Sequence, residues 1–334
     1  MRDALERIVG GATLDVPTAR AVMDVVMDGS ATAAQIGALL ATLRMRGETV
    51  DELTGMVMSM RDHATPVDLE PGAVDTCGTG GDGSNTFNIS TAAALVAAAA
   101  GCRVAKHGNR AASSRCGSAD VLEELGVRVA LDAARVRRCV EEASMGFIFA
   151  PAFHPAMRHA GPVRGQLGFR TVFNVLGPLA SPARVRHQAL GVAGSVPVSV
   201  MAAVLHQLGH KHALVFTGPG GMDEIGLDSV TCGYEVTESG LRELEIDPQG
   251  LGLGTAPRQA LAGGDASANA TIVRAVLDGE AGPRRDVVVL NAAAAMVAAD
   301  VAADLAEGIE RGAAAIDSGG ARRTLGRLVA VSQA

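Results

Sequence analysis

From residue 72 onward the chain repeats one pattern: a short apolar run, a glycine-containing turn and a helix-like run. The expected strands are residues 73–77, 103–106, 147–149, 213–216 and 287–290. The helices expected after three of them are residues 90–100, 119–125 and 291–305. Parallel strands need crossover helices, because the chain must return to the same end of the sheet before each new strand. The pattern therefore predicts an α/β domain with a mainly parallel central sheet, and residues 155–190 are expected to lack strands.

The first 64 residues follow a different, all-helical pattern. Apolar residues recur at spacings of three and four over residues 18–27, and Thr32 and Thr49 can each begin a further helix. The length of 334 residues also favours about two domains. We predict a small helical domain over residues 1–68, to which the chain returns within residues 160–190, and a larger α/β domain formed by residues 72–155 and 191–334.

Charge and composition exclude several classes of function. The 29 basic and 36 acidic residues give a formal charge of −7, which argues against broad binding of nucleic acid or acidic membranes. The longest uncharged apolar stretches, residues 89–102 and 287–299, are too short to cross a bilayer, and charged residues after Met1 interrupt any signal-peptide core. The five cysteines form no Cys-x-x-Cys pair, so we expect reduced thiols, a cytoplasmic protein and oxygen ligands for any metal.

The segment DTCGTGGDGSNTFNIST, residues 75–91, combines a strand end, four glycines and a helix start. Glycines let backbone N–H groups approach a ligand closely, and a helix N-terminus presents unpaired donors to an anion, so phosphate is the expected ligand. The glycines also match the dinucleotide fingerprint GxGxxG, but the acidic residue expected about 20 positions later is missing. A solvated turn before an ordinary alanine-rich helix is the alternative that this segment alone leaves open.

Residues 83–119 contain no Asp or Glu, although the chain is acidic overall. They do contain Arg103, Lys106, Arg110 and Arg115, which gives this window a formal charge of +4. A basic window beside a glycine loop suggests that the ligand is a small polyanion.

Three further features fit a phosphorylated ligand. The segment KHGNRAASSRCGSAD, residues 106–120, follows an expected strand and supplies a lysine and hydroxyls for phosphate, although Ser118 can equally begin a helix. Asp82 stands inside the glycine loop, where it can hold a sugar hydroxyl or metal-bound water. Asp223 and Glu224 follow a later glycine turn, and paired carboxylates suit Mg²⁺ that also binds substrate phosphates, with a solvated turn as the alternative.

Several long motifs follow one another in a specific order. They are QIGALLATLRMRGETVDEL at 35–53, GTGGD at 78–82, NIST at 88–91, KHGNRAASS at 106–114, PAFHPA at 151–156, VRGQLGFRTVFNVLGP at 163–178, the pair Asp223 and Glu224, and LNAAA at 290–294. With these motifs the chain resembles the anthranilate phosphoribosyltransferases, tryptophan-pathway enzymes with a nucleoside-phosphorylase-like fold. The resemblance covers essentially the whole chain.

The resemblance implies transfer of the phosphoribosyl group of 5-phosphoribosyl 1-pyrophosphate to the amine of anthranilate, with release of pyrophosphate. It implies a homodimer, two Mg²⁺ ions per subunit, and catalysis by positioning and electrostatics, with neither nucleic acid nor a membrane as partner. The phosphoribosyl pyrophosphate site would comprise Gly78, Gly81, Asp82, Thr86, Asn88, Ile89, Ser90, Thr91, Lys106, His107, Gly108, Asn109, Arg110, Ala111, Ala112, Ser113, Ser114 and Ser118.

The resemblance also assigns the acceptor and the metal. Gly78, Asn109 and Arg164 would bind anthranilate, with Arg164 on its carboxylate. His107 and His154 would line the entry, although His154 fits a purely structural role equally well. Ser90 would ligate one Mg²⁺, and Asp223 with Glu224 would hold the second. Because the chain has only seven Phe, one Tyr and no Trp, we expect little ring stacking on anthranilate.

The sequence departs from the family pattern at three positions. Thr217 stands where His is usual, Cys116 where Ser is usual, and Ser181 where Asn is usual. Two other functions stay open at this point. A pyrimidine nucleoside phosphorylase shares the fold but has different motifs, and a non-catalytic relative that binds nucleic acid would need a broad basic surface and stacking aromatics, which this chain lacks.

Overall fold

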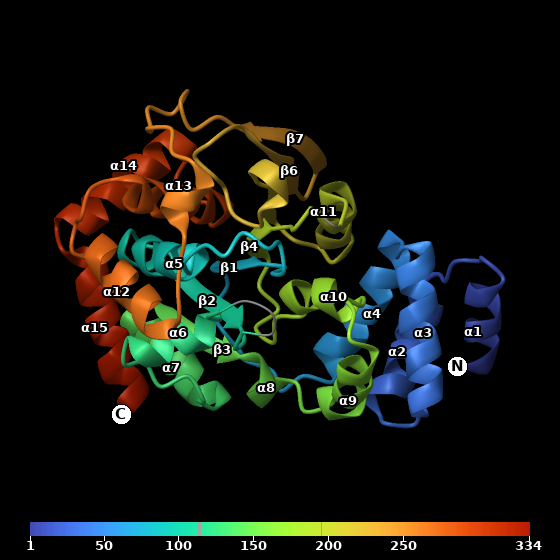
Figure 1. Ribbon diagram of the computed structural model, residues 1–334. Helices are drawn as coiled ribbons and strands as arrows, with labels where there is room; N and C mark the ends of the chain where they lie inside the picture. Colours follow the sequence, from blue (N-terminus) through green and yellow to red (C-terminus); the bar gives the residue numbers. More distant parts are fainter. Residues whose placement is uncertain (112–114, 195) are drawn as a thin grey trace.

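Three of the first four helices begin after a residue whose side chain caps them through a hydrogen bond. The computed structural model describes residues 1–111, 115–194 and 196–334. Its first helices are α1 (Arg2–Val9), α2 (Val16–Met27), α3 (Ala33–Arg46) and α4 (Val50–Asp62), which form a bundle at one end of the molecule (Figure 1). Thr32 and Thr49 each accept a hydrogen bond from the third residue after them, in a capping box with Gln35 and Glu52 respectively. The predicted starts of α3 and α4 are therefore confirmed.

Within the described residues, seven strands form one sheet in the order β3-β2-β1-β4-β5-β6-β7. They are β1 (Ala73–Gly78), β2 (Arg103–Gly108), β3 (Met145–Phe149), β4 (His187–Gly191), β5 (His212–Thr217), β6 (Thr231–Thr237) and β7 (Gly240–Ile246). The strands β1 to β5 run parallel, and β6 and β7 are antiparallel, so the predicted fold class is confirmed. The strand order reverses between β1 and β4, and in open α/β sheets ligands bind beyond the carboxyl ends of the strands at such a point.

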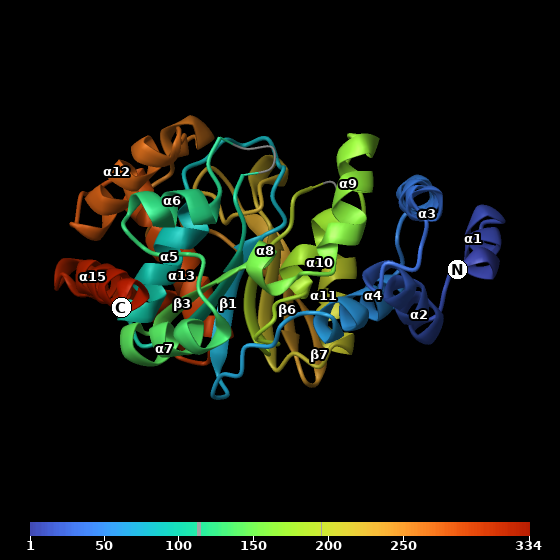
Figure 2. The same ribbon diagram turned by 90° about the horizontal axis from the view of Figure 1, so that it is seen from below.

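Helices cover both faces of this sheet (Figure 2). One face carries α5 (Ile89–Ala99), α6 (Ser118–Glu124), α7 (Ala133–Ala143), α12 (Ala266–Leu277), α13 (Pro283–Ala298), α14 (Leu305–Asp317) and α15 (Gly320–Gln333). On the other side lie α10 (Phe173–Leu179), α11 (Val198–Gln207) and the N-terminal bundle. The helix α9 (Met157–Leu167) packs against α2 and α3, so the middle of the chain contacts the bundle again.

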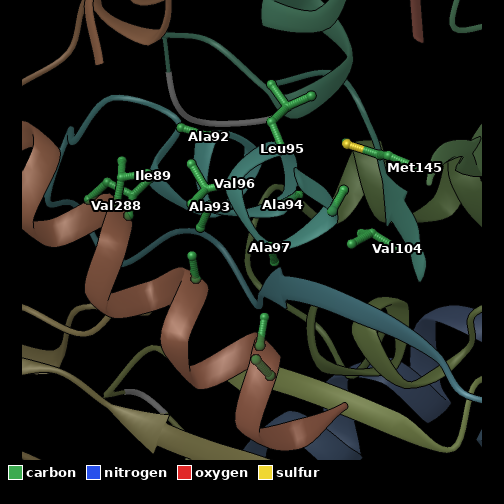
Figure 3. Close-up of a cluster of buried hydrophobic side chains, with 14 of the residues drawn as sticks. Ile89, Ala92, Ala93, Ala94, Leu95, Val96, Ala97, Val104, Met145 and Val288 are labelled. Atoms are coloured by element: carbon green, nitrogen blue, oxygen red, sulfur yellow. The ribbon is translucent and has the colours of Figure 1, made fainter. Parts of the chain in front are cut away.

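Small side chains let the central helices approach one another closely. In Figure 3, α5 lies between Val288 of α13 and the strand residues Val104 and Met145, and all of these side chains are buried.

Residues 287–290, expected to be a strand, belong to α13, so that prediction is wrong. A fully buried helix is apolar on all sides, and a short apolar run then has the same pattern in a helix and in a strand.

The expectation that residues 155–190 lack strands is also wrong at its end, because β4 starts at His187. Its first two side chains are polar but buried: His187 Nδ1 lies 2.8 Å from the carbonyl oxygen of Ala298, and Gln188 Nε2 donates to the carbonyl of Pro178 at 2.8 Å. These internal partners remove the need for apolar residues. The sequence pattern did not indicate the β6–β7 hairpin either.

Across the described ranges, no helix combines the length and apolar character needed to span a bilayer.

Candidate active site

Loops that follow β1, β2 and β5 meet at the carboxyl edge of the sheet and surround two adjoining cavities. The first, of about 320 Å³, is here called the glycine-loop cavity and is lined by residues 77–82, 84–88, 106–111 and 223–224 among others. The second, of about 530 Å³, is called the Arg164 cavity and lies toward α8 (Ala150–Phe153), α9 and α10. The two cavities share a wall that consists of Cys77, Gly78, Thr79, His107, Gly108, Asn109 and Asn174.

Two glycines at strand ends allow the β5–β6 connection to enter the site. A Cβ atom at Gly78 would lie only 2.2 Å from Asp223 Oδ2, and one at Gly191 would lie 1.8 Å from the backbone oxygen of Asp223. Asp223 Oδ2 in turn accepts a hydrogen bond of 2.6 Å from the backbone N–H of Gly80. The glycines at these strand ends therefore place a carboxylate against the glycine loop.

Three carboxylates gather at this point without a matching number of cations. Asp82 Oδ2 accepts a hydrogen bond from the backbone N–H of Asp223 at 3.2 Å, and Glu224 Oε1 accepts one from the backbone N–H of Ser90 at 3.0 Å. Burial, with the charge of Asp82, raises the pKa of Asp223 to about 7. Burial, with the charge of Asp223, raises the pKa of Glu224 to about 8. The oxygen-rich set of Ser90, Asp223 and Glu224 could hold a divalent cation, which would offset the crowded negative charge.

Lys106 is buried beneath the glycine loop. Its Nζ donates to the carbonyl oxygen of Thr76 and, at 3.2 Å, to Ser90 Oγ. Asp75 is buried on the neighbouring strand, where its Oδ1 accepts a hydrogen bond from the backbone N–H of His107 at 3.1 Å. Burial raises the pKa of Asp75 to about 7, although the charge of Lys106 opposes this shift. The lysine therefore links the floor of the site to the start of α5.

The four cations of residues 83–119 do not all face the glycine-loop cavity. Arg103 lies at the opposite end of β2 and donates to the carbonyl of Pro71. Arg110 lines the glycine-loop cavity but forms ion pairs with Asp120, at 3.0 Å, and with Glu123 of α6. Arg115 is exposed and does not line the cavity. The charge of this window is thus divided between the site, an ion-paired loop and the surface.

The Arg164 cavity has a different chemical character. The Arg164 guanidinium lies 5.1 Å from the centre of the Phe173 ring, and no described carboxylate is within ion-pair distance of it. Burial lowers its pKa. The rings of His107 and His154 lie 5.2 Å apart, and burial lowers their pKa values to about 3 and about 4, so both are neutral at pH 7. Two arginines, Arg158 and Arg164, among otherwise uncharged walls suit a small molecule that carries a carboxylate.

The structure brings most of the predicted site residues together. Those that line the glycine-loop cavity are Gly78, Gly81, Asp82, Thr86, Asn88, Ser90, Thr91, Lys106, His107, Gly108, Asn109, Arg110, Ala111, Ser118, Asp223 and Glu224. Gly78, Asn109, Arg164 and His154 line the Arg164 cavity. Ile89 does not line either cavity, because its side chain is fully buried and its N–H donates to the carbonyl of Phe87. Ala112, Ser113 and Ser114 lie outside the described residues.

Two residues that sequence reasoning missed also line the site. Arg170 and Asn174 both border the glycine-loop cavity, and Asn174 borders the Arg164 cavity as well. Both belong to the motif at 163–178, and Arg170 is a cation in a segment of few charges. That signal could have marked Arg170, but its partner, the carbonyl of Gly80 at 2.9 Å, lies 90 positions earlier in the chain.

Known proteins match the chain along its whole length. The description "Glycosyl transferase family, helical bundle domain" matches residues 2–64, and "Glycosyl transferase family, a/b domain" matches residues 70–322. The anthranilate phosphoribosyltransferase of Thermomicrobium roseum is 56% identical over 335 residues, which cover 99% of this chain and 96% of that protein. The chain belongs to the anthranilate phosphoribosyltransferase family.

Solved structures of this family have the same fold. The anthranilate phosphoribosyltransferase of Thermus thermophilus gives a TM-score of 0.94 at 43% identity and covers 99% of this chain and 100% of its own. The enzyme of Saccharomyces cerevisiae in complex with PRPP and Mg gives a TM-score of 0.89 at 25% identity, with 99% of this chain and 97% of its own covered.

The three departures from the pattern of anthranilate phosphoribosyltransferases lie at different depths. Thr217 ends β5 and donates through Oγ1 to the carbonyl of Val192 at 2.9 Å, so it joins two strand ends. Cys116 is buried and lines the glycine-loop cavity. Ser181 is buried away from both cavities. Of the three, Cys116 is therefore the one that borders the site.

Proposed function

We propose that the chain transfers the phosphoribosyl group of 5-phosphoribosyl 1-pyrophosphate to the amine of anthranilate, forming N-(5-phosphoribosyl)anthranilate and pyrophosphate in tryptophan biosynthesis. The observation that carries this proposal is the shared wall at Gly78 and Asn109, which separates a cavity rich in loop N–H groups and carboxylates from one built around Arg164. Two different substrates can thus meet there. The identity to named relatives supports the same reaction.

The phosphorylated donor would occupy the glycine-loop cavity. The loops after β1 and β2 supply backbone N–H groups and hydroxyls, and Lys106 supplies a buried positive charge. Ser118 donates through Oγ to the carbonyl of Asn109 at 3.3 Å, which ties the second loop to the start of α6. These groups offer a polyanion both hydrogen-bond donors and positive charge.

The residues present fit Mg²⁺, which would be held by Ser90, Asp223 and Glu224, as two ions per subunit. Within the described ranges, no group of three or more His, Cys, Asp or Glu side chains is arranged so that it could hold a metal ion by itself. Mg²⁺ commonly joins one or two carboxylates to substrate phosphates, so an incomplete protein shell suits it. When bound, it would supply positive charge to the departing pyrophosphate. Burial, with the charge of neighbouring carboxylates, raises the pKa values of Asp223 and Glu224, and a bound cation would lower them again.

Anthranilate would enter the Arg164 cavity with its carboxylate on Arg164 and its amine toward the shared wall. Its amine is neutral and nucleophilic at pH 7, so the chemical barrier lies in the departure of pyrophosphate from the anomeric carbon. Lys106 and the loop N–H groups stabilise the charge that leaves, and positive charge develops on the ribose as the amine attacks the opposite face. The neutral His107 and His154 add no positive charge that would oppose this step.

Assembly as a homodimer through the helical bundle belongs to the same proposal. Met45 and Val9 are large apolar side chains of the bundle that are 88% and 69% exposed in the single chain, and a second copy would cover them. The molar mass in solution, measured by light scattering, would be twice that of one chain. A cytoplasmic location is likewise proposed.

The direct test mixes the protein with 5-phosphoribosyl 1-pyrophosphate, Mg²⁺ and anthranilate and follows the loss of anthranilate fluorescence. The matched controls are Glu224→Gln, which removes one proposed metal ligand, and a sample with a chelator. In both controls the fluorescence of anthranilate should stay unchanged. Wild-type protein that leaves the fluorescence unchanged would contradict the proposal. Phosphorolysis of thymidine or uridine would instead identify a nucleoside phosphorylase, and nucleic-acid binding at physiological salt without turnover would identify a non-catalytic relative.

A further inference from the structure

Arg170 reaches into the glycine loop from the opposite side of the site. It lies in the connection between α9 and α10, and its Nη1 donates to the carbonyl of Gly80 at 2.9 Å. Gly81 has a φ of +70°, and a Cβ atom there would lie 1.6 Å from the same nitrogen. The absence of a side chain at Gly81 therefore makes room for this guanidinium.

The second guanidinium nitrogen of Arg170 is buried without a partner. Its Nη2 has no hydrogen-bond acceptor among the described residues, and none of their carboxylates lies within ion-pair distance. A buried charged donor without an acceptor costs free energy, so such a group is expected to meet an anion that the free protein does not contain.

The other cations of the glycine-loop cavity already have charged neighbours. Arg110 is paired with Asp120 and Glu123. Lys106 lies close enough to Asp75 and Glu224 for its charge to oppose the rise in their pKa values, and its Nζ donates to the carbonyl of Thr76 and to Ser90 Oγ. Of the cations that line this cavity in the described chain, Arg170 is thus the one with a buried donor atom that has no acceptor.

The position of Arg170 also selects one end of the ligand. Gly80 accepts from Arg170 through its carbonyl and donates through its N–H to Asp223, so the guanidinium lies at the end where the carboxylates gather. Arg170 does not line the Arg164 cavity. On the basis of the proposed function, we infer that Arg170 binds the diphosphate group of 5-phosphoribosyl 1-pyrophosphate through Nη2 while Nη1 holds Gly80.

The test compares Arg170→Gln and Arg170→Lys with wild type and with Arg103→Gln. Arg103 is the matched control, because its substitution removes one positive charge from the same domain at the far end of β2. For Arg170→Gln we expect the KM for 5-phosphoribosyl 1-pyrophosphate and the inhibition constant of inorganic pyrophosphate to rise roughly tenfold to a hundredfold. The KM for anthranilate should stay within about twofold, because the acceptor cavity is untouched. Arg170→Lys keeps the positive charge but not the two guanidinium nitrogens, so it should bind pyrophosphate more tightly than Arg170→Gln and less tightly than wild type.

A second readout separates binding from folding and from the proposed reaction. Calorimetry measures inorganic pyrophosphate binding with Mg²⁺ and without anthranilate, and added guanidinium at low millimolar concentration should restore part of the binding to Arg170→Ala. Unchanged pyrophosphate binding by Arg170→Gln, or a rise in the anthranilate KM alone, would overturn the inference. If wild type does not consume anthranilate yet binds pyrophosphate through Arg170, the reaction proposed above fails while this inference stands.

Discussion

Replacing Asn291 with leucine should loosen the segment that carries Asp223 and Glu224. Asn291 lies in α13 among apolar neighbours and is itself buried. Its Oδ1 accepts a hydrogen bond from the backbone N–H of Ile225 at 3.1 Å, and its Nδ2 donates to the carbonyl of Ile225 at 3.0 Å. One amide side chain therefore holds both backbone groups of the residue that directly follows Glu224.

The magnitude follows from the groups that the substitution leaves without partners. Leucine has a similar volume but cannot hydrogen-bond, so the buried N–H and C=O of Ile225 both lose their partners. Each unsatisfied buried group costs about 1–3 kcal/mol, and part of this is offset because a polar side chain no longer has to be buried. We expect the free energy of unfolding to fall by about 2–4 kcal/mol.

Urea unfolding and a Mg²⁺ titration of turnover would test this reasoning. The Mg²⁺ concentration for half-maximal rate should rise by about tenfold or more, which corresponds to about 1.4 kcal/mol lost in placing the carboxylates. Leu328→Ala is the control, because loss of this buried leucine of α15 should lower stability by a similar amount, about 2–5 kcal/mol, without changing the site. An unchanged Mg²⁺ dependence in a folded Asn291→Leu protein, or an equal shift in the control, would refute the argument.

Three further predictions concern single side chains. Arg164→Ala should raise the KM for anthranilate far more than that for 5-phosphoribosyl 1-pyrophosphate in steady-state kinetics, and equal losses would contradict its assigned role. Burial raises the pKa of folded Asp75 from 3.8 to about 7, so between these values the folded state binds more protons than the unfolded state and stability falls as pH rises. The variant Asp75→Asn lacks this pH dependence. Urea unfolding should therefore show its free energy of unfolding, relative to that of wild type, rising by about 4 kcal/mol between about pH 4 and about pH 8. A difference that does not change with pH would disprove the raised pKa. Glu52→Ala should lower the free energy of unfolding by about 3 kcal/mol, because Glu52 is buried and accepts hydrogen bonds from the N–H groups of Leu14 and Thr49. A loss below about 1 kcal/mol would show that water takes the place of the carboxylate as the acceptor.

Local signals made much of the fold predictable. Thr32 and Thr49 cap their helices through residues three positions away, so a short stretch of sequence contains the whole interaction. The run at 287–290 could not be assigned in this way, because its burial depends on distant helices and on the sheet. The strand β4 was missed for a related reason, because it begins with the polar residues His187 and Gln188. Their hydrogen-bond partners lie 111 and 10 positions away, and only those partners allow polar residues in a buried strand.

The site shows the same division between local and distant information. Glycine turns after expected strands were enough to place residues 78–91 and 106–111 at one sheet edge. The basic window at 83–119 suggested a polyanionic ligand, but its sequence could not show that Arg110 forms ion pairs with two carboxylates of α6. Arg170 was missed because its partner lies on a different strand's loop, and no pattern in one sequence connects the two.

The shared wall separates residues that border both cavities from residues that border the Arg164 cavity alone. The residues of this wall also line the glycine-loop cavity, and Gly78 has no room for a larger side chain beside Asp223. The rest of the Arg164 cavity comes from α8, α9 and α10, at positions such as Pro151, Met157 and Phe173 that do not border the glycine-loop cavity. Substitutions at such positions within residues 150–178 could therefore change which acceptor is bound, in evolution or in the laboratory. The glycine-loop cavity would keep its lining, because these positions do not border it.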